Sequence, residues 1–99
     1  PERPWLMNGV TGSSGSGNEP KPGTHHPHRH GNLWAYNLGG HRHEAELLQA
    51  LEPLGLEPEV QLLPCSGPFA RGIHLVASLP LARATSAEDA RAAYERAYA

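Results

Sequence analysis

Residues 33–63 read LWAYNLGGHRHEAELLQALEPLGLEPEVQLL, and this stretch decides the fold class. The aromatic-rich segment Leu33–Leu38 is followed by two glycines, which is typical of a short strand that ends in a turn. Leucines recur at helical spacing over Glu44–Glu52, with acidic residues in the first turn and a proline directly after it. The β-rich run Val60–Leu63 comes next. The stretch therefore predicts a strand, a helix and a strand in succession.

The flanking segments predict two more strands and a second helix. Trp5–Thr11 and Gly72–Leu79 are strand-like runs, and we expect the second to lie beside Val60–Leu63. Thr85–Glu88 has the spacing of a capping box, and apolar residues repeat at helical spacing after it. Gly12–Asn32 lacks apolar periodicity and predicts a long loop, either functional or disordered. The expected fold is α+β, a mainly antiparallel sheet with two helices on one face.

Composition narrows the class of protein. The chain has 99 residues, which suits one small domain, and a net charge of -2 without a basic stripe, so we expect no nucleic-acid partner. A single Cys excludes an intrachain disulfide and favours a reducing compartment. No apolar run approaches the roughly 20 residues that span a bilayer, so we expect a cytoplasmic protein without membrane contact. The start at Pro1, without Met, suggests a piece of a longer protein.

Histidines are concentrated in one part of the chain. Six of the seven fall between residues 25 and 43, four of them in the run His25–His30. Imidazoles in such a run can bind Zn(II), Ni(II) or Cu(II). A structural zinc site needs four fixed ligands, so a solvated loop is the favoured interpretation and we predict no resident metal. A noncatalytic His-rich metal-binding or oligomerisation module stays open as an alternative function.

The motif His41-Arg42-His43 lies between two glycines and the predicted helix. A histidine held at a helix start can act as a general acid or base near pH 7, and the guanidinium of Arg42 can bind a carboxylate or a phosphate. The alternative is a polar turn in which one histidine caps the helix and the other lies in solvent.

Three further features of the sequence are each open to two interpretations, a functional one and a purely structural one. Gly12–Gly17 (GSSGSG) resembles a phosphate-cradling loop, because small residues let backbone N–H groups approach an anion, but a flexible linker has the same composition. Arg71, at the head of a predicted strand, could bind an anionic ligand or lie free on the surface. Cys65 lies in a turn without a cue for thiolate activation, so we expect an inert thiol.

Taken in order, these motifs resemble the catalytic region of the N-acetyl-gamma-glutamyl-phosphate reductases and of the related amino-adipyl-phosphate reductases, whose substrate is attached to a carrier protein. The family pattern is a Ser-Gly-x-Gly loop, a His-Pro segment, a Tyr strand, a His-Arg-His motif with a Glu three residues later, and an Arg-Gly-Ile strand. The matching positions are Ser14–Gly17, His26-Pro27, Tyr36, His41–His43 with Glu46, and Arg71–Ile73.

The resemblance implies a fold, a reaction and a set of site residues. The fold would be the C-terminal substrate and dimerisation domain of glyceraldehyde-3-phosphate and semialdehyde dehydrogenases, with residues 1–99 as one domain of a two-domain reductase. The reaction would be reduction of an acyl phosphate to a semialdehyde in arginine or lysine biosynthesis, with NADP(H) bound mainly outside this segment. A homo-oligomer is implied, and the acyl phosphate could be carried on a carrier protein. Catalytic roles would fall to His41 and His43, and substrate binding to Ser14, Gly15, Arg42 and Arg71.

The chain also departs from the family pattern. The family's nucleophile lies in a Pro-Gly-Cys motif, which this sequence lacks together with the nucleotide domain, so we expect the segment alone to be inactive. Asn18 stands where many members have Arg or Lys. Ala45 replaces a Pro that is common in the glutamyl enzymes, and with the paired His25 and His26 it slightly favours the lysine-pathway relative.

Overall fold

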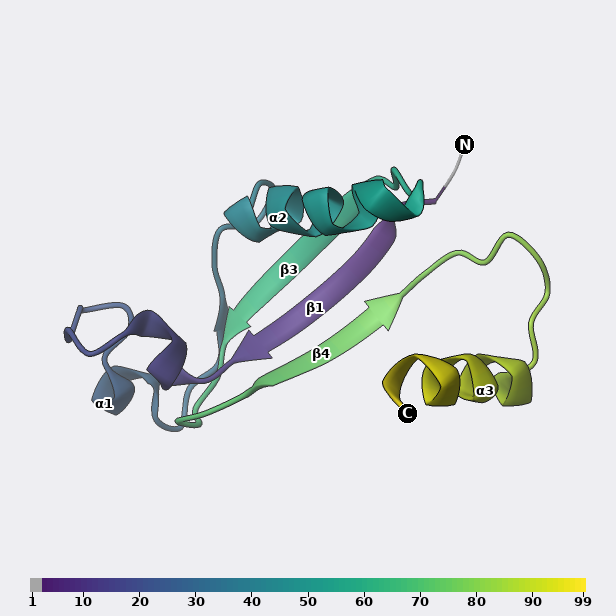
Figure 1. The fold of residues 1–99 in the computed structure, drawn as a ribbon. Coiled ribbons are helices and arrows are strands. Elements are labelled where there is room, and N and C mark those ends of the chain that lie inside the picture. The colour runs from purple at the N-terminus through teal and green to yellow at the C-terminus, as the bar shows by residue number, and fades with distance from the viewer. Residues whose placement is uncertain (1–2) are drawn as a thin grey trace.

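The computed structural model describes residues 3–99 and confirms the α+β class (Figure 1). The strands are β1 (Trp5–Thr11), β2 (Trp34–Ala35), β3 (Val60–Ser66) and β4 (Ile73–Ser78). The α-helices are α1 (His26–Arg29), α2 (Arg42–Leu51) and α3 (Ala87–Tyr98), and two 3₁₀ turns are η1 (Ser13–Ser16) and η2 (Glu52–Leu54). No helix within residues 3–99 combines the length and the apolar composition needed to cross a membrane.

The sheet is mixed, so the prediction of a mainly antiparallel sheet is wrong. Its strand order is β2-β3-β1-β4, with β1 parallel to β3 and antiparallel to β4. Parallel neighbours need a long crossover connection, and the segment containing α2 supplies it between β1 and β3. The expected pairing of the third and fourth strands is also wrong, because β1 lies between them.

Helix α2 packs against β3 on one face of the sheet (Figure 1). Side chains of β1 and β3 alternate accordingly, since Met7 and Leu62 are half-buried while Leu6 and Leu63 on the opposite face are each 42% exposed. Glu44 Oε1 accepts the backbone N–H of Leu62 at 2.9 Å, which fixes the start of α2 against β3. The first turn of α2 is thereby held in one place relative to the sheet.

The two predicted helices exist, but their starts differ from the expected ones. Helix α2 begins at Arg42, because the ring of His41 caps it. Helix α3 is capped by Ser86, whose Oγ accepts the N–H of Asp89 at 3.0 Å, so the expected box at Thr85 and Glu88 is displaced by one residue. The third helix, α1, has only 4 residues and lies within the predicted loop 12–32, where no apolar periodicity marks it.

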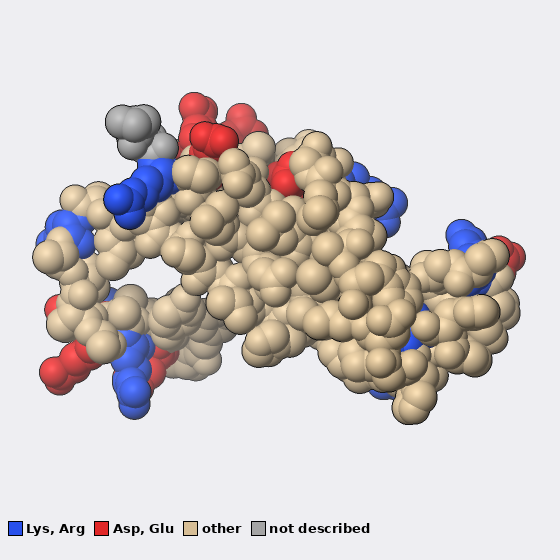
Figure 2. Space-filling view, turned by 180° about the vertical axis from the view of Figure 1, so that it is seen from behind, with Lys and Arg blue, Asp and Glu red and all other residues tan. Residues whose placement is uncertain are grey.

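Much of the apolar surface is uncovered. None of the apolar side chains of residues 3–99 is fully buried, and all six residues of β4 are exposed. Helix α3 follows an extended connection and lies beyond the β4 edge, with Tyr94 64% and Tyr98 83% exposed (Figure 1). The prediction that both helices cover one face of the sheet therefore fails for α3. In Figure 2 charged side chains gather along one edge and at the ends, and the middle of that face carries none.

Candidate active site

The Ser-rich turn at the end of β1 is ordered and packs against the segment between β3 and β4. Backbone N–H groups of Gly12, Ser13 and Ser14 donate to the carbonyl oxygens of Gly72, Phe69 and Ala70 at 2.8, 3.0 and 2.9 Å. These three N–H groups are therefore not free to cradle a phosphate, which corrects that part of the sequence interpretation. The flexible-linker alternative does not fit this hydrogen-bonded turn either.

Glycine is required at position 12 by close packing. A Cβ added there would lie 2.8 Å from the carbonyl oxygen of Ala70 and 2.9 Å from the backbone nitrogen of Arg71, which is closer than real Cβ atoms come. A Cβ at Gly15 would meet nothing within 4 Å. The turn therefore presses against the Arg71 segment at its base and is open at its tip.

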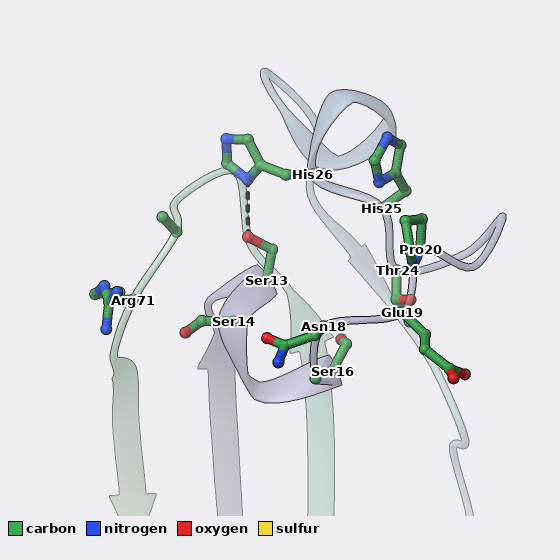
Figure 3. A pocket seen from close by; sticks show the side chains of 12 residues that line it. Ser13, Ser14, Ser16, Asn18, Glu19, Pro20, Thr24, His25, His26 and Arg71 are labelled. Carbon is green, nitrogen blue, oxygen red and sulfur yellow. Dashed lines mark hydrogen bonds between the residues drawn. The ribbon is translucent and has the colours of Figure 1, made fainter.

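A small cavity of about 290 Å³ lies beside the turn. Its lining includes Ser13, Ser14, His26 and Arg71, so the fold brings Arg71 next to the serine turn although the two are far apart in the sequence (Figure 3). The hydroxyl of Ser13 and Nδ1 of His26 lie 2.8 Å apart, which ties the turn to the start of α1 (Figure 3). Sequence analysis did not identify this Ser–His pair.

His41 is the better placed of the two candidate histidines. It is 8% exposed, and its ring lies edge-on to Tyr36, with the ring centres 5.7 Å apart. Nδ1 accepts the backbone N–H of His43 at 3.3 Å, so the neutral ring carries its proton on Nε2. His41 is therefore held with Nε2 as its available donor.

His43 has a different environment. Its side chain is 50% exposed, and Nε2 lies 3.8 Å from Oε2 of Glu46. The rings of His41 and His43 are 4.5 Å apart between centres. One histidine caps the helix and the other is half in solvent, which matches the alternative interpretation of the motif, yet both also line a cavity.

That cavity, of about 1020 Å³, lies between the serine turn, Tyr36 and the start of α2. Five of the six predicted site residues line this cavity, namely Ser14, Gly15, His41, Arg42 and His43. The sixth, Arg71, lines the smaller cavity instead. Ser14 lines both cavities, so the two spaces meet at the turn.

The charged side chains that line the large cavity are all positive. Lys21, Arg29 and Arg42 are in its lining, and none of its described lining residues is Asp or Glu. Cations without carboxylates in a concave surface concentrate a positive potential there, which attracts anions. Lys21 and Arg29 were not predicted as site residues, because only the folded chain shows that they converge with the His41 motif.

The His-rich segment forms pairs only. Ring centres of His26 and His30 are 6.0 Å apart, and those of His25 and His28 are 6.2 Å apart. Within residues 3–99 no group of three or more His, Cys, Asp or Glu side chains is arranged to hold a metal ion. The metal-binding alternative gains no support from this geometry.

Comparison with known proteins adds an independent finding. The family model described as semialdehyde dehydrogenase, dimerisation domain, matches residues 1–99. A putative [LysW]-L-2-aminoadipate 6-phosphate reductase of Thermomicrobium roseum is 42% identical over 87 residues, which is 84% of this chain and 25% of that protein.

Two N-acetyl-gamma-glutamyl-phosphate reductases are similarly close. That of Saccharopolyspora erythraea is 42% identical over 91 residues, covering 90% of this chain and 27% of the relative. That of Corynebacterium glutamicum is 39% identical over 92 residues, covering 91% and 26%. The chain thus spans about a quarter of the length of these relatives.

Proposed function

Because the chain belongs to the semialdehyde dehydrogenase dimerisation-domain family, we propose that it is the substrate-binding and dimerisation part of a reductase that converts an acyl phosphate to a semialdehyde. The substrate would be an N-acyl-gamma-glutamyl phosphate or an amino-adipyl phosphate. The amino-adipyl phosphate could be attached to a carrier protein, and the name of the Thermomicrobium relative includes LysW. The matched relatives are named as reductases of these two acyl phosphates. A cytoplasmic location stays a prediction.

The observation that carries the proposal is the cation-lined cavity beside His41. An acyl phosphate brings a phosphoryl group with negative charge to a site where Lys21, Arg29 and Arg42 meet no described carboxylate. The guanidinium of Arg42 can bind phosphate or carboxylate oxygens in a bidentate manner. The Ser14 hydroxyl and Arg71 can bind oxygens on the other side of the turn, in the smaller cavity.

His41 has the geometry of a proton donor in this reaction. When a nucleophile adds to the carbonyl carbon, negative charge develops on the carbonyl oxygen, and a positioned N–H stabilises it or transfers its proton. The Nε2–H of His41 is the donor that its hydrogen bond to the His43 backbone leaves available. His43 would assist as a neighbouring substrate-binding group in the same cavity.

In this proposal NADP(H) is bound mainly outside this segment, because the serine turn lacks the features of a dinucleotide-binding turn. A dinucleotide is held by a glycine-rich turn that opens a helix with free N–H groups, whereas here Gly12, Ser13 and Ser14 donate theirs to residues 69–72. The turn is a 3₁₀ turn that ends at Gly17 rather than a helix start. In this proposal the hydride donor is bound by another part of the complete protein, and the nucleophile also lies there because this sequence lacks a Pro-Gly-Cys motif.

The family assignment as a dimerisation domain supports a homo-oligomer. We place the contact with a second copy of the chain on β4 and α3, because these elements expose apolar residues and β4 is bonded to a neighbour along one edge only.

The reaction is tested by giving the complete protein, in separate assays, N-acetyl-gamma-glutamyl phosphate and carrier-linked amino-adipyl phosphate together with NADPH. With one substrate we expect one mole of NADPH to be oxidised and one mole of phosphate to be released per mole of semialdehyde formed. With the other substrate we expect kcat/KM to be lower by a factor of at least about 100. Absence of NADPH oxidation with both substrates would contradict the proposal.

A further inference from the structure

Arg29 is a buried cation at the end of α1. It is 2% exposed, and its guanidinium points at the junction between β1 and the serine turn. Nη1 donates to the carbonyl oxygen of Gly12 at 3.3 Å and lies 3.5 Å from Oγ of Ser16. Nη2 donates to the carbonyl oxygen of Thr11 and lies 3.5 Å from Oγ1 of the same residue. One side chain thus spans both ends of the turn.

The charge of Arg29 has no acidic partner within residues 3–99. Its described partners are backbone carbonyl and hydroxyl oxygens, and its Nε is buried with no hydrogen-bond partner. Burying a cation with only dipoles around it costs free energy, so a fold keeps such a group where its position matters. The planar fork can reach two successive carbonyl oxygens at once, which the single ammonium of a lysine cannot do.

The serine turn is therefore held from two sides. On one side, carbonyl oxygens of residues 69–72 accept the backbone N–H groups of residues 12–14. On the other side, Arg29 donates to the carbonyl oxygens of residues 11 and 12 and lies within 3.5 Å of the Ser16 hydroxyl. Arg29 lines the large cavity with Ser14 and His41. Its contacts at Gly12 and Ser16 flank Ser14 on both sides, and its guanidinium adds positive charge to the wall of the cavity.

We propose that Arg29 is a positioning residue for anion binding: it fixes the Ser13–Ser16 turn beside His41, and its unmatched buried charge strengthens the binding of the substrate phosphate in the large cavity. This inference rests on the proposed function, since it concerns the same site. It assigns no contact between Arg29 and the reacting atoms.

The test compares Arg29→Lys and Arg29→Gln in the complete protein, with Arg83→Lys and Arg83→Gln as matched controls at an exposed arginine. Three quantities are measured for each variant: kcat, KM for the acyl phosphate, and the rise in melting temperature caused by inorganic phosphate at constant ionic strength. Arg29→Lys keeps the charge and loses the fork, whereas Arg29→Gln loses the charge as well.

We expect KM to rise about 10-fold in Arg29→Lys and about 100-fold in Arg29→Gln, with kcat changed less than KM and the phosphate-induced rise in melting temperature reduced in the same order. The Arg83 variants should match the unaltered protein. A lower melting temperature with unchanged KM and an unchanged response to phosphate would show a merely structural role and overturn the inference. Loss of folding in both Arg29 variants would do the same.

The phosphate measurement separates this inference from the proposed reaction. If the unaltered protein reduces neither acyl phosphate, yet phosphate stabilises it and Arg29→Lys weakens that stabilisation, the reaction is wrong and the role of Arg29 stands. If the protein is active and Arg29→Lys changes neither KM nor the phosphate response, the role of Arg29 is wrong and the reaction stands.

Discussion

His41→Ala in the complete protein is expected to lower kcat at least about 100-fold, the usual effect of losing a positioned general acid or base. The imidazole is 8% exposed, lines the cation-rich cavity and has Nε2–H as its available donor. No other described histidine combines this burial with a place in that cavity. The measurement is the steady-state rate of NADPH oxidation with saturating acyl phosphate.

Because His41 also caps α2, a loss of activity in the alanine variant could come from a weakened helix. His41→Asn is the matched control, since asparagine is a good N-cap acceptor but cannot act as an acid or base. We expect both variants to lose activity, while only the alanine variant loses about 1 kcal/mol of unfolding free energy. Full activity in His41→Asn would remove His41 from the chemistry and leave it as a helix cap.

Leu75→Glu is expected to lower the molar mass of the complete protein from that of the proposed homo-oligomer to that of a smaller species. Leu75 lies in the middle of β4 and is 56% exposed, and its neighbour Val76 is 57% exposed. A carboxylate placed in an interface formed by such a strand must be desolvated without a partner, which raises the dissociation constant by about 100-fold or more. The measurement is molar mass by light scattering over a range of protein concentrations.

Leu54→Glu is the control for this experiment. Leu54 is 70% exposed, but it lies in η2 beyond the end of α2 rather than on β4. We expect that variant to keep the molar mass of the unaltered protein. If Leu75→Glu is folded and keeps the molar mass of the unaltered protein, the contact between subunits does not use β4, and that part of the proposed function fails.

The sequence predicted those elements whose signals are local. Leu47 and Leu51 mark α2 by their spacing, and the Ser86 region marks the start of α3 to within one residue. Strand order was not predictable in this way, because the place of β1 between β3 and β4 depends on pairing between residues more than 50 positions apart, such as Asn8 with Leu63.

Only those candidate site residues that belong to local sequence motifs could be proposed in advance. The motif at His41–His43 and the residues Ser14 and Gly15 were proposed as site residues from the sequence and its family resemblance, and the fold gathers them around one cavity. Arg29 was missed, because a charged residue in a His- and Pro-rich segment has the sequence signal of a solvated loop, and its burial depends on the carbonyl groups of Thr11 and Gly12.

The central claim is that the cation-lined cavity beside His41 binds the phosphate of the substrate, and product inhibition by inorganic phosphate tests it most directly. In the complete protein we expect phosphate to inhibit competitively against the acyl phosphate. Arg42→Gln, at the rim of the cavity, should raise the inhibition constant at least about 10-fold, because a charge-assisted bidentate contact is lost. Arg83→Gln, at an exposed site between β4 and α3, should leave the constant unchanged. Inhibition that is not competitive, or that Arg42→Gln does not weaken, would place the phosphate elsewhere and contradict the claim.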